Sequence, residues 1–199
     1  VTFIDNGNGT ATLAGTPAAG TNGAYPIVIT AANGVPPNAT QNFPLRVNED
    51  PHADSDRDSA IDPEERGPGG NDPSYDGNRD GTPDWQQGNV ASFHTSDQER
   101  GRHYLTLAIA SGGRIESLFV PSSFDAPPPA GVSFPHGLFS FTIRDLAVGG
   151  GATATIYLDG EPPQTYYKYG KTPDIPVDHW YEFSYDGETG AEAKGDTVV

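Results

Sequence analysis

Residues 49–84 are so rich in acidic residues and so poor in apolar ones that they cannot form a hydrophobic core of their own. They include twelve Asp and Glu residues against three Arg residues, a net charge of −9 in 36 residues. Carboxylates at this density repel one another unless water solvates them or a cation neutralises them. The segment is therefore either a solvated linker or a cation-binding element, and any core must come from the residues on either side.

The acidic residues fall into two similar twelve-residue loops offset by 22 residues: residues 54–65 (the first loop) and residues 76–87 (the second loop). Side-chain oxygens occupy positions 1, 3, 5, 9 and 12 of each loop, and position 7 can add a backbone carbonyl. The predicted metal-ligating residues are Asp54, Asp56, Asp58, Ala60, Asp62 and Glu65 in the first loop, and Asp76, Asn78, Asp80, Thr82, Asp84 and Gln87 in the second. Six to eight hard oxygens suit Ca²⁺, whereas Mg²⁺ prefers an octahedral, partly hydrated shell. We therefore predict about two or more bound calcium ions.

The two loops differ at position 6, where the chain turns sharply. This position is Gly81 in the second loop and Ser59 in the first, so the second loop has the better backbone while the first carries more charge. The flanking residues lack long amphipathic helices, so paired EF-hands that open onto a target are not expected. A solvated linker is the alternative interpretation, and the match of five positions in both loops favours metal sites over it.

Strands rather than helices are expected on both sides, because the 199 residues include 25 Gly and 19 Pro. In residues 1–48 the apolar alternation and the Asn-Gly turns predict strands at 1–5, 10–14, 24–31 and 41–47. In residues 89–199 the same alternation predicts strands around 104–109, 139–144, 155–158 and 180–185, each with one buried face. The fold class is therefore predicted as all-β, with antiparallel β-sandwich modules at 1–48 and 89–199 joined by a calcium-binding linker at 49–88.

Three stretches resemble segments of bacterial surface proteins. The hairpin NGNGTATLAGTPAAG, within residues 1–48, resembles the C-terminal half of the immunoglobulin-like repeats of such proteins. The Asp-rich loops resemble the calcium-binding repeats of thrombospondin type 3. The motifs DGNRDGTPDWQQGNVASF, GVSFPHGLFSFTI, TYYKYGKTPD and HWYEFSYDGETGAE are similar to the choice-of-anchor U domain over residues 76–199. These resemblances imply a non-catalytic, calcium-stabilised module of a secreted cell-surface or fibre-forming protein, located outside the bacterial cell.

The overall charge and composition exclude several kinds of partner. The net charge of −16 makes nucleic acids and anionic membrane surfaces poor partners. No run approaches the ~20 apolar residues of a spanning helix, so membrane insertion by this segment is not expected. The absence of cysteine excludes disulfides and thiolate metal sites.

The sequence does not predict an enzyme. It lacks a nucleophile elbow, a phosphate-binding glycine loop and a zinc-binding helix motif, and its five His residues are scattered. A close pair of carboxylates could serve a glycosidase, but 27 acidic residues make some such pair inevitable. The alternative function is a carbohydrate-binding adhesin module that stacks aromatic rings on glycans. Its candidate residues are Tyr166, Tyr167, Tyr169, Trp180, Tyr181 and Tyr185.

Residues 1–48 are too few to close a sandwich, so the faces carrying Tyr25, Ile27 and Phe43 would stay partly uncovered. An uncovered strand edge beside an apolar face can accept a further strand. We therefore expect partners that add a strand, either other copies of the chain in a head-to-tail filament or adjacent domains of the parent chain.

Overall fold

A computed structural model of the chain describes residues 1–18, 20–97, 101–110, 112–122 and 126–199. It confirms the prediction of an all-β protein with antiparallel sheets, and within those ranges the one helical segment is the 3₁₀ turn η1 (Asp84–Gln86). The chain divides into two compact units, Val1–Pro51 and His52–Val199. The acidic loops thus belong to the same unit as the C-terminal strands.

The first unit consists of two β-hairpins. Its strands are β1 (Thr2–Asp5), paired with β2 (Ala11–Ala14), and β3 (Gly23–Ala31), paired with β4 (Ala39–Val47). All four lie where the apolar alternation predicts them. In the first hairpin the Asn6 N–H donates to the Thr10 carbonyl at 3.0 Å, and Gly7 adopts a φ of 72°, which glycine tolerates best.

The apolar side chains of the first unit are exposed or at most half-buried. Tyr25 lies opposite Leu45 and Ile27 opposite Phe43, so the predicted apolar positions of the two strands do coincide. Even so, no described residue of this unit is buried, and Phe3 of β1 is 55% exposed. The addition of a strand from elsewhere, which would cover such a face, stays a prediction.

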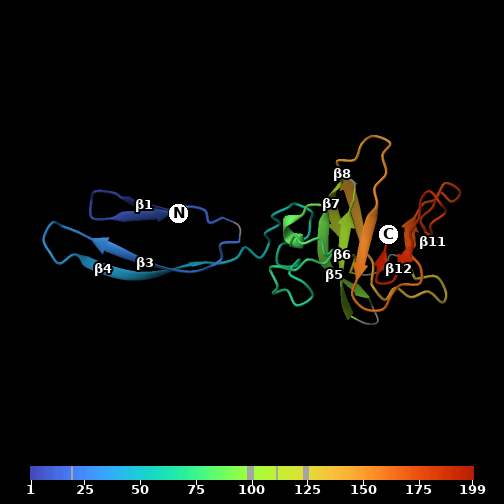
Figure 1. Ribbon diagram of the computed structural model, residues 1–199, viewed down its shortest axis with the longest axis horizontal. Helices are drawn as coiled ribbons and strands as arrows, with labels where there is room; N and C mark the ends of the chain where they lie inside the picture. Colours follow the sequence, from blue (N-terminus) through green and yellow to red (C-terminus); the bar gives the residue numbers. More distant parts are fainter. Residues whose placement is uncertain (19, 98–100, 111, 123–125) are drawn as a thin grey trace. The chain divides into compact units, whose positions relative to one another are not determined.

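A five-stranded antiparallel sheet with the order β12–β13–β9–β6–β5 is the largest element of the second unit (Figure 1). Its strands are β5 (Val90–Asp97), β6 (Gly101–Ile109), β9 (Ala154–Leu158), β12 (Ala193–Lys194) and β13 (Thr197–Val198). Two further hairpins are formed by β7 (Arg114–Phe119) with β8 (Ser140–Arg144), and by β10 (Tyr167–Gly170) with β11 (His179–Glu182). The predicted strands correspond to β6, β8, β9 and β11, although β11 ends before Tyr185, which is 56% exposed.

The hydrophobic core of the second unit lies against one face of this sheet. Its buried members include Ala91, Phe93, Leu105, Leu107, Ile115 and Ile156. They come from β5, β6, β7 and β9, so residues far apart in the sequence share one core. Phe139 packs edge-on against Phe93, with 5.4 Å between the ring centroids.

The opposite face of β6 is also buried, which corrects the prediction of a single buried face for this strand. Tyr104 and Thr106 alternate with the core residues, and both are at most 3% exposed. The acidic stretch covers them, since Tyr104 is hydrogen-bonded to Glu64 and Gly67, and Thr106 lies against Gly77. Figure 1 shows this stretch in teal and green beside β5 and β6. The sheet therefore has an apolar layer on one face and the candidate metal loops on the other.

Candidate metal centre

The two acidic loops share one backbone plan. Positions 4 and 6 have positive φ in both, at 64° and 80° in Arg57 and Ser59 and at 61° and 93° in Arg79 and Gly81. Each loop is closed by an N–H of position 9 that donates to the carbonyl just before position 1. These bonds are 2.7 Å from Asp62 to Ala53 and 3.0 Å from Asp84 to Tyr75. Ser59 therefore adopts the left-handed turn that glycine makes in the second loop.

The carboxylates at positions 1 and 5 hold backbone N–H groups of their own loop. In the first loop, Asp54 accepts bonds from Arg57 and Ser59 at 2.7 and 3.2 Å. In the second, Asp76 accepts from Asp80 and Gly81 at 3.1 and 2.7 Å. Asp58 and Asp80 each accept the N–H two residues further on, at 2.7 and 2.9 Å. These bonds curl each loop so that alternate side chains point inward.

The predicted ligands at position 9 serve as internal braces. Asp62 accepts the backbone N–H and the hydroxyl of Ser55, both at 2.7 Å. Asp84 likewise accepts the N–H of Gly77, at 3.1 and 3.0 Å to its two oxygens. Both carboxylates are buried. Each one bonds position 9 of its loop to position 2, which is Ser55 in the first loop and Gly77 in the second.

The first loop gathers carboxylate oxygens that have no hydrogen-bond partner. Asp54, Asp56 and Asp58 each offer an oxygen within 4.8 Å of the others. Both oxygens of Asp56, Oδ2 of Asp58 and Oε2 of Glu65 are buried and unpartnered. Asp58 and Glu65 have no exposed surface at all. Buried ionised carboxylates without a partner are strongly destabilising, so this cluster needs either protons or a cation.

The pKa values in the first loop also indicate that ionised carboxylates are unfavourable there. Burial, reinforced by the charge of Asp54, raises the pKa of Asp56 from 3.8 to about 7. Burial first and the neighbouring Asp56 second raise the pKa of Asp58, and burial together with the charge of Asp58 raises that of Glu65. Each side chain is thus disfavoured as an anion where it lies, which a divalent cation among the same oxygens would reverse.

The donor set of the first loop fits a hard cation. All its side-chain donors are carboxylate oxygens, and Ala60, at position 7, is itself buried. Carboxylate and carbonyl oxygens are the ligands that Ca²⁺ takes, while softer metals favour nitrogen or sulfur. Asp54, Asp56 and Asp58, whose oxygens lie within 4.8 Å of one another, would hold the ion, and Glu65 and the Ala60 carbonyl are the further ligands that the loop pattern predicts.

The second loop is more exposed, and its polar groups pair with one another. Asn78 donates to Asp80 at 3.0 Å, and the Gln87 amide donates to Asp80 at 3.3 Å and to the Thr82 carbonyl at 3.1 Å. Asp80 and Thr82 are exposed. A half-turn of the Gln87 amide would present its oxygen to the loop centre in place of its nitrogen. A cation here would compete with water and existing hydrogen bonds, so the second loop is the weaker candidate.

Ser92 of β5 links both loops to the sheet. Its N–H donates to Glu65 Oε1 at 3.3 Å, and its hydroxyl donates to Asp84. The Ser92 and Thr106 hydroxyls lie 2.5 Å apart, and a β-carbon on Gly77 would come within 2.0 Å of Thr106 Oγ1. The last ligand of the first loop and the brace of the second are therefore anchored on one strand residue.

The sequence did not single out the strand residues that support the loops, namely Ser92, His94, Tyr104 and Thr106. Their only signal is polarity at the positions of β5 and β6 that alternate with the apolar core. The indole N–H of Trp85, in the second loop, donates to the Pro73 carbonyl just before that loop, at 2.8 Å.

All six aromatic residues proposed for glycan binding line one cavity of about 1110 Å³ in the second unit. Trp180 contacts the rings of Phe134 and Tyr169, with centroids 4.7 and 5.0 Å away and planes tilted by 32° and 55°. Tyr166 packs against the core. Three of the six rings, those of Tyr166, Tyr169 and Trp180, therefore contact one another or the core.

Comparison of the chain with protein-family models, with curated proteins and with solved structures gave no match in any of the three. The described part of the chain contains no helix with the length and apolar character needed to cross a membrane.

Proposed function

We propose that this chain is a non-catalytic structural module whose second unit is stabilised by calcium ions in the acidic loops. The observation that carries the proposal is the set of buried, unpartnered oxygens of Asp56, Asp58 and Glu65. Buried polar atoms in proteins nearly always have partners, so a group of them facing one loop calls for a ligand. A divalent cation bound in the first loop would neutralise these carboxylates together.

The ion would act as a fastener between the acidic stretch and the sheet. The first loop contacts β7 where the Ser59 hydroxyl donates to the Glu116 carbonyl, and it contacts β5 through Glu65. Neutralising its carboxylates would let the loop pack on β5 and β6 without the cost of buried charge. Because the covered face of β6 depends on this loop, ion binding would be coupled to the stability of the whole unit.

The expected affinity suits a protein that works outside the cell. Extracellular calcium modules bind with dissociation constants of about 10⁻⁴ to 10⁻³ M, and the high charge of the first loop favours somewhat tighter binding. Calcium at about 100 times the dissociation constant would add about 2.7 kcal/mol to the free energy of unfolding. An extracellular, surface-associated location follows as part of the proposal.

Calorimetry on the metal-stripped full chain tests the proposal. We expect heat on addition of Ca²⁺ and a rise in melting temperature, both greatly reduced in Asp58→Asn. Asp174→Asn is the matched control, because Asp174 carries the same charge on an exposed part of the same unit. Absence of calcium binding by the unmodified chain, or equal loss in both variants, would refute the proposal.

A further inference from the structure

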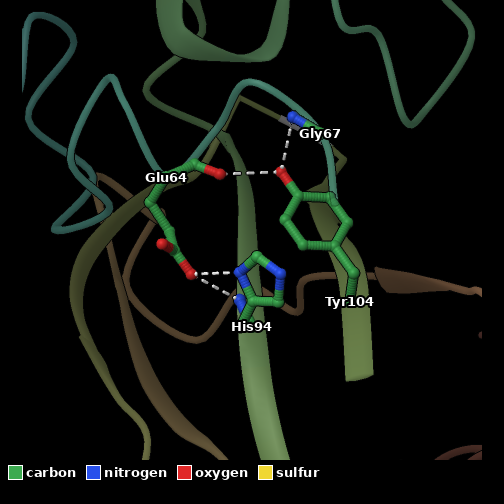
Figure 2. A network of polar contacts seen from close by, with 4 residues as sticks. All are labelled: Glu64, Gly67, His94 and Tyr104. Atoms are coloured by element: carbon green, nitrogen blue, oxygen red, sulfur yellow. Dashed lines mark hydrogen bonds and ion pairs between the residues drawn. The ribbon is translucent and has the colours of Figure 1, made fainter. Parts of the chain in front are cut away.

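Tyr104 of β6 is bonded to the chain on both sides of Glu65. Its hydroxyl donates to the Glu64 carbonyl at 2.9 Å and accepts the Gly67 N–H at 3.1 Å, as Figure 2 shows. The side chain is only 3% exposed. One hydroxyl of the sheet therefore spans the short segment that carries the position-12 residue of the first loop.

The side chain of Glu64 is also held in place, by His94 of β5, the strand that pairs with β6. Its Oε1 accepts both the backbone N–H of His94 at 2.8 Å and the ring Nδ1 at 2.7 Å (Figure 2). The His94 ring lies edge-on to Tyr104, with centroids 4.8 Å apart. Residues 64–67 are thus tied to β5 and β6 by contacts that do not involve the Glu65 side chain.

Residues 64–67 also pack closely against an aromatic ring at Gly67. Gly67 has a φ of 75°, and a β-carbon there would lie 2.7 Å from the ring of Tyr75. The Tyr75 ring in turn packs edge-on against Tyr104, with centroids 5.4 Å apart. A side chain at position 67 would therefore displace the Tyr75 ring, which packs on Tyr104.

The Glu65 carboxylate makes little contribution to its own placement. Its Oε1 accepts one long bond from Ser92, at 3.3 Å, and its Oε2 has no partner. Carboxylates at position 12 of such loops bind Ca²⁺ with both oxygens, a mode that the smaller octahedral Mg²⁺ does not favour. The placement of Glu65 consequently bears on which ion binds, and not only on how tightly.

We propose that Tyr104 is a positioning residue for the first loop: its hydroxyl holds Glu65 in the two-oxygen geometry that distinguishes Ca²⁺ from Mg²⁺. This inference rests on the proposed calcium function. Supporting residues behind metal ligands are known to control affinity by fixing ligand orientation. Here the support acts on the backbone on both sides of the ligand, through a group more than 35 residues away in the sequence.

The test uses Tyr104→Phe, which removes the hydroxyl and keeps the ring that packs on Tyr75. All variants carry Asp80→Ala, so that the second loop does not contribute and the first is measured alone. We expect Tyr104→Phe to weaken Ca²⁺ binding about tenfold, the scale of one or two lost hydrogen bonds, while Mg²⁺ binding changes about twofold or less. Tyr166→Phe is the matched control, because Tyr166 is a tyrosine packed against the core. It should leave the binding of both ions unchanged.

A double-mutant cycle with Glu65→Gln separates positioning from general stability. If Tyr104 acts through Glu65, Tyr104→Phe has no further effect on Ca²⁺ binding once Glu65 is Gln. Should Tyr104→Phe not be obtained folded, His94→Ala removes one of the two bonds to the Glu64 side chain and gives the same test with a smaller expected effect.

The outcomes distinguish this inference from the function on which it rests. A parent chain that binds no calcium overturns both. If the parent binds Ca²⁺ and Glu65→Gln weakens it, but Tyr104→Phe lowers Ca²⁺ and Mg²⁺ binding equally, the positioning role is wrong and the calcium function stands. The same conclusion follows if Tyr104→Phe has its full effect in the Glu65→Gln background.

Discussion

Without metal ions, the free energy of unfolding of the second unit should decrease as the pH rises. Asp56 has a pKa of about 7 in the folded chain, against an ordinary value of 3.8. Between these values the folded state binds more protons than the unfolded state, so the free energy of unfolding decreases with increasing pH. The difference of about three pKa units corresponds to about 4 kcal/mol from this one residue, fully available below pH 3.8 and lost above about pH 7.

The neighbouring residues extend this effect in the same direction. Burial raises the pKa of both Asp58 and Glu65, so the decline continues above pH 7. Saturating calcium should abolish it, because the ion binds the ionised carboxylates and takes the place of the protons. The assay is urea denaturation of the metal-stripped chain and of the calcium-loaded chain from about pH 5 to about pH 8. Ion-free stability that stays level or increases over this range would show that the carboxylates are not buried as described.

Three further predictions concern single features. Glu65→Gln should raise the melting temperature of the metal-stripped chain, because Gln needs no proton to be buried, whereas Glu65 must take one up on folding. The same variant should reduce the rise in melting temperature that calcium produces. Scanning calorimetry in both states checks this, and a lowered ion-free melting temperature would contradict it. Gly81→Ala, at a φ of 93° with open space around it, should cost about 1 kcal/mol in urea denaturation. Gly77→Ala should cost more, because its β-carbon would collide with Thr106 Oγ1, and equal losses would argue against this contact. Light scattering should show association of the full chain that Phe3→Ser weakens, whereas a monodisperse monomer would count against strand addition.

Much of the local structure could be predicted from residue spacing. The Asn-Gly turns and the alternation around Tyr25 and Ile27 place the strands of the first unit within one or two residues of their observed bounds. The shared backbone plan of the two loops follows from oxygen-bearing residues at matched positions. In each case the interactions lie within about a dozen residues, so the sequence pattern contains both partners.

The difference in burial between the two loops could not be predicted from residue spacing. Glu65 and Asp58 are buried because β5 and β6 lie beneath them, and the contacts come from Ser92 and Tyr104, which lie far along the chain. Strand β5 was not predicted from the sequence, for a related reason. Both of its faces are covered, so Val90 and Ser92 are as buried as Ala91, and the contrast between inward and outward positions disappears.

The anchoring of both loops on Ser92 limits how the length of this region can vary. Successive side chains of a strand point to opposite faces, so deleting one residue between Gln87 and Ser92 would turn the serine toward the side of Ala91 and Phe93. Glu65 and Asp84 would lose their common partner in the same step. Related sequences should therefore keep the number of residues between the second loop and this serine unchanged, even where the loop residues themselves differ. Insertions and deletions would be tolerated instead at the exposed turn around Gly69 and Gly70, which separates the two loops.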